Sequence, residues 1–400
     1  MVTRRIIAPE NVWDSRPQLY YAQGLLADET IYISGQTAWD EKRNLVGPGD
    51  IESQTRMALE DIRRILEAEG AKMSDIVKMI FFTKDIRFLR RGEYFAKVLK
   101  EFFGPITPPC TGVQIGNLWN PDFWIEIEAY AVKNAKSRKI IAPANVWDAR
   151  PELYYAQGMN VDDTIYISGQ TAWDEKRKLQ GPGDIETQAR LSLENIRRLL
   201  EAEGAKMSDV VKMIFFTKDM RLLRRDELFA KVLKEFFGPI TPPCTAVQIA
   251  NLWNPDFLIE IEAIAVKNAK SKKIVAPSNV WDSRPKQYYA QAMNVDGTVY
   301  FSGQTALDEN SKLVGLGDIE AQTRQSFENI RRLLESEGKK MSDIVKMIFF
   351  TKDIRYLRRG QLFAKVLKEV FGPITPPCTG VQILNLWEPD FLIEIEGIAR

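Results

Sequence analysis

The chain has 400 residues and carries 55 Lys and Arg against 54 Asp and Glu, so its net charge is close to zero. A protein that covers a phosphate backbone carries a strong basic excess, which this sequence lacks, and we therefore expect no nucleic acid partner. Hydrophobic residues make up 45% and charged residues 27% of the chain, values typical of a globular protein and not of a disordered or fibrous one.

The first predicted elements are a hairpin and a helix. Residues 20–40 alternate between apolar and polar side chains in their second half and have a polar break at 27–29, which predicts two strands. Asp50 follows a Gly-Pro-Gly turn and is a favourable N-cap. Apolar residues then recur three and four positions apart as far as Gly70, which predicts an amphipathic helix over 50–70.

The next elements are one strand, a second helix and two more strands. Residues 75–86 form a β-rich run, and 90–104 show helical spacing before a Gly-Pro stop. Two further strands are predicted over 110–118 and 123–132, and the Pro and Asp residues of 119–122 favour a turn between them.

The same elements occur three times. The motif Pro-Pro-Cys-Thr recurs with a period of 134 residues, at Cys110, Cys244 and Cys378. Such a period is too long for a solenoid, so each copy is expected to be a separate domain. Short polar and basic junctions separate the copies, which gives the domain boundaries 1–135, 136–269 and 270–400.

The element order β-β-α-β-α-β-β predicts an α+β fold, a mixed sheet with both helices on one face. The other face of such a sheet must be buried. With three equal copies in one chain, we expect three sheets around a pseudo-threefold axis, helices outward, with clefts between copies. The chain is expected to be monomeric as a fused pseudo-trimer.

The remaining composition bears on environment and chemistry. No apolar run approaches the roughly 18 to 20 residues of a membrane-spanning helix, and the first residues lack the apolar segment of a signal peptide. The three cysteines are an odd number and are expected to be free thiols in a reducing compartment, which favours the cytoplasm and no membrane partner. Histidine is absent, which excludes a Ser-His or Cys-His pair and the commonest metal ligand.

Several motifs within each copy occur in the order of a known family. In the first copy they are YAQG, ISGQTAWDE, FFTKDI, PPCTGVQI and IEIEAYAV. The sequence resembles the Rid/YjgF family, the reactive intermediate deaminases, over nearly the whole of each copy. The resemblance implies a chorismate-mutase-like fold and a trimer with sites in the clefts between subunits. It also implies hydrolysis of enamines and imines, such as 2-aminoacrylate, without a metal or organic cofactor.

Three family positions are matched in every copy. The Tyr of the family's YxQG motif, expected to bind substrate, falls on Tyr21, Tyr155 and Tyr289. The glycine of its SGQ strand, also expected to bind substrate, falls on Gly35, Gly169 and Gly303. Its catalytic Glu, expected to orient a water for attack on a C=N carbon, falls on Glu126, Glu260 and Glu394.

One position departs from the family pattern. Where the family has a carboxylate-binding Arg, this sequence has Cys110, Cys244 and Cys378. The bidentate anchor for a substrate carboxylate is therefore missing. Each copy also has an Arg five residues before the motif Tyr, at Arg16, Arg150 and Arg284. These arginines are either replacement anchors for an anionic substrate or ordinary surface charges.

Three functions remain open on the residues. The first is a Rid-like hydrolase with a remodelled site, acting on a small imine, enamine or related electrophile. The second is a non-catalytic binding protein or an engineered single-chain trimer scaffold. The third is a thiol-dependent enzyme in which the cysteines are nucleophiles; the alternative for these cysteines is a buried thiol that fills the space of the lost Arg.

The copies also differ from one another near the expected clefts. Trp39 and Trp173 are replaced by Leu307 in the third copy, so some clefts are expected to differ in shape. Two further sets of tryptophans would either wall a pocket or pack between copies; they are Trp13, Trp147 and Trp281, and Trp119, Trp253 and Trp387.

Overall fold

Each repeat forms one six-stranded mixed sheet. The computed structural model describes residues 3–90, 94–105, 108–239, 241–358, 362–372 and 376–400. The first sheet has the order β1 (Arg4–Ile7), β2 (Gly24–Ala27), β3 (Thr30–Gln36), β6 (Ile125–Val132), β4 (Ile76–Thr83) and β5 (Cys110–Gln114). Only β4 and β5 are parallel, and the other neighbours are antiparallel.

The second and third sheets repeat this order. The second is β7 (Arg138–Ile141), β8 (Gly158–Val161), β9 (Thr164–Gln170), β12 (Ile259–Val266), β10 (Val210–Thr217) and β11 (Cys244–Gln248). The third is β13 (Lys272–Val275), β14 (Ala292–Val295), β15 (Thr298–Gln304), β18 (Ile393–Ala399), β16 (Ile344–Thr351) and β17 (Cys378–Gln382). The α+β class predicted from the sequence, three tandem mixed sheets with helices, is confirmed.

The first strand of each repeat is the element that the sequence prediction omits. β1 has only four residues, too few to show an alternating pattern. It becomes a strand because it pairs antiparallel with β2, from Arg4 opposite Ala27 to Ile7 opposite Gly24. The sheet therefore has one more strand than the predicted order contains.

The long helices begin and end close to where the sequence predicts. They are α2 (Ile51–Glu67), α6 (Ile185–Glu201) and α10 (Ile319–Glu335). Each begins after an Asp whose carboxylate accepts a hydrogen bond from a backbone N–H of the first turn, as Asp50 does from Glu52 at 3.0 Å.

The second predicted helix of each repeat is divided. In the first repeat the two parts are α3 (Ile86–Arg90) and α4 (Tyr94–Phe103). In the second they are α7 (Met220–Arg224) and α8 (Leu228–Phe237), and in the third they are α11 (Ile354–Arg358) and α12 (Leu362–Phe371). In the second repeat, Asp226 and Glu227 adopt the left-handed region at φ 54° and 53°, which breaks the helical ladder between α7 and α8. The predicted helix over 90–104 is confirmed from Tyr94 to Phe103, and residues 91–93 at its start lie outside the described residues.

Short helical turns complete each repeat. The α-helical turns α1 (Arg16–Leu19), α5 (Arg150–Leu153) and α9 (Arg284–Gln287) precede the motif tyrosines. The 3₁₀ turns are η1 (Met73–Asp75), η2 (Met207–Asp209), η3 (Arg225–Glu227) and η4 (Met341–Asp343). In the described part of the chain, no helix combines the length and apolar character that crossing a bilayer requires.

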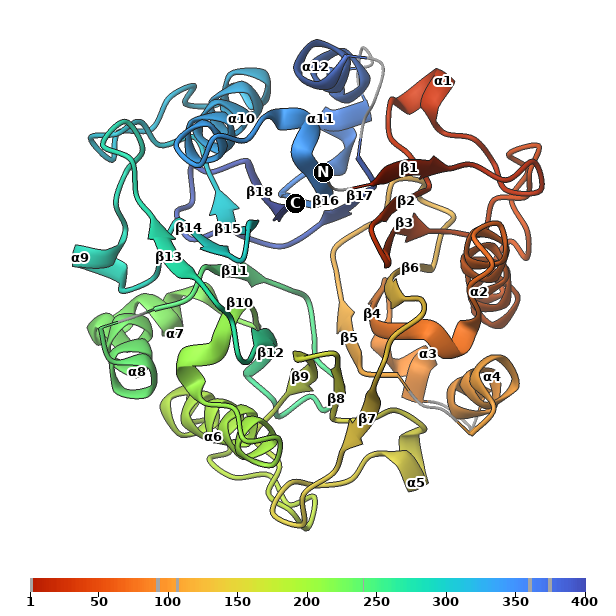
Figure 1. Ribbon diagram of the computed structural model, residues 1–400, viewed down its shortest axis with the longest axis horizontal. Helices are drawn as coiled ribbons and strands as arrows, with labels where there is room; N and C mark the ends of the chain where they lie inside the picture. The colour runs from red at the N-terminus through yellow and green to blue at the C-terminus, as the bar shows by residue number, and fades with distance from the viewer. Residues whose placement is uncertain (1–2, 91–93, 106–107, 240, 359–361, 373–375) are drawn as a thin grey trace.

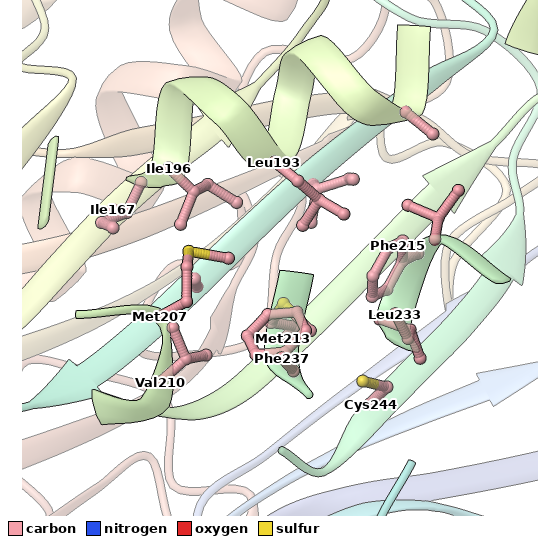
Figure 2. Packing of buried hydrophobic residues seen from close by; sticks show 14 of the residues in the cluster. Ile167, Leu193, Ile196, Met207, Val210, Met213, Phe215, Leu233, Phe237 and Cys244 are labelled. Carbon is pink, nitrogen blue, oxygen red and sulfur yellow. The ribbon is translucent and has the colours of Figure 1, made fainter. Parts of the chain in front are cut away.

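One face of each sheet packs against its own helices. Figure 2 shows this core in the second repeat, where Leu193 and Ile196 of α6 lie over Met213 and Phe215 of β10. Cys244 lies in the same apolar cluster. The helices thus cover one face of the sheet, as amphipathic helices beside an α+β sheet must.

The other face of each sheet contributes to cores shared by all three repeats. Successive strand residues point to opposite faces, so Met79 and Phe81 of β4 face the helices while Ile80 and Phe82 face away from them. Ile80 and Phe82 join their counterparts from β10 and β16 in one buried cluster. Figure 1 shows the three sheets around a common centre, with the helices outside.

The ring of repeats is closed by backbone contacts. Isolated bridges join Pro109 to Ala156 and Pro243 to Ala290, which link the first repeat to the second and the second to the third. A third bridge joins Ala22 to Pro377, and so links the third repeat back to the first. Each repeat therefore contacts both others.

Candidate functional site

The first cleft lies between repeats one and three. It is a cavity of about 50 Å³ lined by Tyr21, Gly35 and Glu126 of the first repeat and by Cys378 and Gly380 of the third. Four of these residues, Tyr21, Gly35, Glu126 and Cys378, were predicted from the sequence. The cysteine comes from the neighbouring repeat, because β17 lies next to β3.

The other clefts contain the equivalent residues. The second cavity, also about 50 Å³, is lined by Tyr155, Gly169 and Glu260 of the second repeat together with Cys110 of the first. The third is about 370 Å³ and is lined by Tyr289, Gly303 and Glu394. Cys244 is not among the residues that line it, but this thiol is close enough to contribute to the raised pKa of Tyr289.

The predicted glycine and glutamate are in close contact. Glu126 of β6 lies directly over Gly35 of β3, where a Cβ at position 35 would overlap the carboxyl group. The strand register shifts here, between Ile33 and Gln36. The Gly35 N–H donates to Thr379 Oγ1 of the third repeat at 2.9 Å. Glycine is therefore needed at this position for space.

The three site glutamates are poorly ionised at neutral pH. Burial raises the pKa of each to about 8, and a second glutamate two residues further along the strand raises it as well. Lys346 and the Gly380 N–H oppose this shift at Glu126. Near pH 7 the side chain mostly carries a proton, so it is able to act as a general acid.

A buried ion pair that sequence reasoning missed lies behind each site. Lys346 Nζ is 2.9 Å from Glu128 Oε2, and both side chains are only 1% exposed. Lys346 also donates to Thr379 Oγ1 at 2.8 Å, the same oxygen that accepts from Gly35. The equivalent pairs are Lys78 with Glu262 and Lys212 with Glu396. The sequence feature that could have indicated this ion pair is a single lysine within an otherwise apolar strand.

The largest cavity is elsewhere. It has a volume of about 560 Å³ and is lined by one tyrosine from each repeat, Tyr32, Tyr166 and Tyr300, among other residues. None of the residues predicted to form the site lines it. Among the described residues, no group of three or more Cys, Asp and Glu is arranged to hold a metal ion.

Comparison with known proteins gives the family. The sequence profile described as endoribonuclease L-PSP matches residues 14–133, 148–267 and 282–400. The chain belongs to this family. The Rid/YjgF assignment made from the sequence is confirmed, since relatives include RutC family proteins and TdcF.

Individual relatives of this family match about one repeat each. A RutC family protein of Pyrococcus horikoshii is 36% identical over 131 residues, which is 32% of this chain and 98% of that protein. TdcF of Escherichia coli, which is named among the reactive intermediate deaminases, is 36% identical over 118 residues, 29% of this chain and 88% of that protein.

One solved structure resembles most of the chain. A chorismatase superimposes on 82% of this chain and 93% of its own, with a TM-score of 0.53 and 10% identity. At that identity the likeness concerns the fold alone. A crystal structure of E. coli TdcF with bound serine covers 32% of this chain and 99% of its own, with 31% identity and a TM-score of 0.29.

The cysteines that stand where the L-PSP family is expected to have Arg are buried thiols. They are 4–8% exposed. Cys110 Sγ donates to the Pro108 carbonyl at 3.4 Å, and its backbone N–H donates to Ser168 Oγ at 2.9 Å. Burial strongly raises the pKa of all three thiols. These features favour the protonated, space-filling thiol over a nucleophilic thiolate.

A different arginine from the one expected lies at the first cleft. Arg16 is engaged by Asp14 at 2.7 Å and does not line that cavity, whereas Arg43 does. Asp148 and Asp282 engage Arg150 and Arg284 in the same way. The Arg43 guanidinium lies 5.0 Å from the ring centre of Trp13 and 5.6 Å from that of Trp39. Sequence reasoning missed Arg43, which follows the SGQ strand in a loop.

The tryptophans of the turn before β6 have both of the suggested roles. Trp119 lines the first cavity and also contacts Phe363 of the third repeat, with ring centres 5.9 Å apart. Trp253 lines the second cavity and lies 6.4 Å from Phe95 of the first repeat. They wall a pocket and pack between repeats at once.

Proposed function

We propose that this chain is a Rid-like hydrolase that converts small enamines and imines into carbonyl compounds and ammonia in the clefts between repeats. The observation that carries the proposal is a buried glutamic acid, with a pKa of about 8, held over a glycine in a small cavity. The relationship to TdcF, named as a reactive intermediate deaminase, supports the same reaction class.

The carboxyl group of Glu126 supplies the proton that the reaction requires. It gives its proton to the β-carbon of an enamine, the C=C electrons form the new C–H bond, and the nitrogen lone pair forms C=N. Water then adds through oxygen to the C=N carbon and returns one proton to Glu126. The hydroxyl proton moves to nitrogen, ammonia leaves and a carbonyl forms. One water is consumed and one ammonia is released.

The substrate carboxylate needs a cation that the cysteine positions do not provide. Arg43 lines the first cleft and is close enough to Tyr21 to oppose the rise in its pKa that burial causes, and Arg177 has the same relationship to Tyr155. Each has a planar guanidinium suited to a carboxylate. We therefore assign the anchoring role to Arg43 and Arg177 instead of Arg16 and Arg150.

The test is ammonia release from freshly generated 2-aminoacrylate. The variant with Glu126, Glu260 and Glu394 all changed to Gln should lose at least about a hundredfold in rate, because an amide cannot donate the proton. Glu67→Gln, at an exposed position on α2, is the matched control and should keep the rate. Wild-type activity should fall above about pH 8 as the acid ionises.

Two other results would contradict the proposal. If the triple variant were as active as the wild type, the glutamates would not be the acid. If neither protein released ammonia above background, the clefts would belong to a binding or scaffold protein. Loss of activity on substitution of the cysteines by Ser, with the fold retained, would instead support the thiol-dependent alternative.

A further inference from the structure

The third cleft differs from the other two in size. Its cavity is about 370 Å³, against about 50 Å³ for each of the others. Two residues at its wall account for this: Leu307 stands where the other repeats have Trp39 and Trp173, and Ser311 stands where they have Arg43 and Arg177. The two changes affect side chains that touch each other in the other repeats.

In the first two repeats these residues are stacked against one another beside the cleft. Arg177 lies 4.8 Å from the ring centre of Trp147 and 5.0 Å from that of Trp173. Trp173 in turn packs edge-on against Phe257 at 4.8 Å. The first repeat has the same arrangement, with Trp39 at 4.9 Å from Phe123. Aromatic rings and a guanidinium packed in this way leave little room beside the glutamate.

The chemical groups of the third cleft are nevertheless retained. Glu394 lies over Gly303 as closely as in the other copies, and burial raises its pKa to about 8. The Gly303 N–H donates to Thr245 Oγ1 of the second repeat at 2.9 Å. The third cleft is therefore larger than the other two and keeps its buried glutamate.

The wider cavity has a mixed lining, in which polar and charged residues, Glu388 and Asp390 among them, lie beside apolar and aromatic ones. Leu307, Leu313, Trp281, Trp387 and Phe391 all contribute to it. Lys286, on α9, provides a cation at the same cavity, where the equivalent residues of the other repeats are Gln18 and Glu152. The apolar part of this lining suits a large apolar side chain of a ligand, and Lys286 suits a carboxylate.

We propose that the clefts divide substrates by size: the third takes imino acids with bulky apolar or aromatic side chains, and the first two take only small ones. Leu307 and Ser311 are the residues that set this specificity. This inference rests on the proposed function for its chemistry, but the selectivity of binding can be tested separately.

The activity test compares two substrates. These are 2-aminoacrylate and the imino acid generated from phenylalanine by an amino-acid oxidase. Glu394→Gln should lower release from the bulky imino acid at least about tenfold and release from 2-aminoacrylate by only about a third. The double variant Glu126→Gln/Glu260→Gln should lower release from 2-aminoacrylate by about two thirds and leave release from the bulky imino acid unchanged. Equal losses on both substrates in every variant would overturn the inference and leave the proposed function standing.

The exchange variants test the two named residues. Gln18→Lys/Trp39→Leu/Arg43→Ser opens the first cleft, replaces the Arg43 cation by one at the position of Lys286, and should raise turnover of the bulky imino acid about twofold, because two clefts instead of one admit it. Leu307→Trp/Ser311→Arg closes the third cleft and should reduce that turnover at least about tenfold. Unchanged turnover in both variants, with unaltered unfolding midpoints, would overturn the assignment.

A binding measurement tests the selectivity of the clefts independently of the hydrolysis reaction. Phenylpyruvate, the keto acid product, should bind to the wild type at about one equivalent per chain in calorimetry. It should bind at about two equivalents to Gln18→Lys/Trp39→Leu/Arg43→Ser and not at all to Leu307→Trp/Ser311→Arg. If no ammonia is released but these ratios hold, the proposed function fails and the selectivity survives. Equal binding to all three proteins, or none to any, would overturn it.

Discussion

Glu126 occupies the space that a side chain at Gly35 would fill. The two residues lie on neighbouring strands, and the carboxyl group sits where a Cβ on Gly35 would be. The same relationship holds between Glu260 and Gly169 and between Glu394 and Gly303. Glu126 can therefore occupy this position only because residue 35 has no side chain.

Gly35→Ala should displace Glu126 and destabilise the chain. A methyl group at this buried contact is expected to cost about 1–3 kcal/mol of unfolding free energy, because the strands on both sides are fixed. Urea unfolding would measure this. The matched control is Gly112→Ala, where a Cβ meets nothing within 4 Å and the second repeat already has Ala246. An equal effect of both substitutions would contradict the packing argument.

Lys346→Met should be strongly destabilising. It leaves the Glu128 carboxylate buried without its cation, which costs about 3–5 kcal/mol of unfolding free energy. Lys365→Met, which breaks an exposed pair with Glu320, should cost less than about 1 kcal/mol. Adding Glu128→Leu to Lys346→Met should recover most of the lost unfolding free energy, since no buried charge remains. A double variant less stable than Lys346→Met would refute this explanation.

Stability should fall as the pH rises from about 4.3 to about 8. The unfolded pKa of Glu is about 4.3, and the folded pKa of the three site glutamates is about 8. In this window the native state holds protons that the unfolded state lacks. The unfolding free energy therefore decreases by about 1.4 kcal/mol per pH unit for each group and levels off above pH 8.

The check is urea unfolding across this pH range with the triple Glu→Gln variant as reference. The difference in unfolding free energy between wild type and variant should follow the predicted slope, since Gln does not titrate. A difference independent of pH would show that the folded pKa values are not raised.

The cysteines should react slowly in the native state. Each thiol is buried and has a raised pKa, so little thiolate is available near neutral pH. Iodoacetamide at pH 7.5 should label all three promptly in concentrated urea and label the folded chain at least about tenfold more slowly. Prompt labelling of the folded protein would favour the thiol-dependent alternative.

The chain should remain a single molecule in solution. The bridges between repeats close on themselves through Ala22 and Pro377, so the sheet faces that would otherwise join subunits are already occupied within one chain. Light scattering should give the mass of one chain over a wide range of concentration. A trimer of chains would indicate that repeats are exchanged between molecules.

The sequence by itself determined the repeat and the main strands and helices, and it supplied the residues expected at the site. A period of 134 residues and near-identical motifs are local properties of the sequence. The helix beginning after Asp50 and the strands of residues 20–40 follow from capping and alternation, which depend on neighbours in the chain. Tyr21, Gly35 and Glu126 were recognised from motifs and do share one cavity.

Only the tertiary structure decided what surrounds those residues. The strand β1 exists because β2 is there to pair with it, and four residues show no pattern of their own. The proximity of Arg43 to Tyr21, the pairing of Lys346 with Glu128 and the raised pKa of Glu126 depend on segments far apart in the sequence. Burial and charge act through space, so these properties emerge only when the three repeats close around one another.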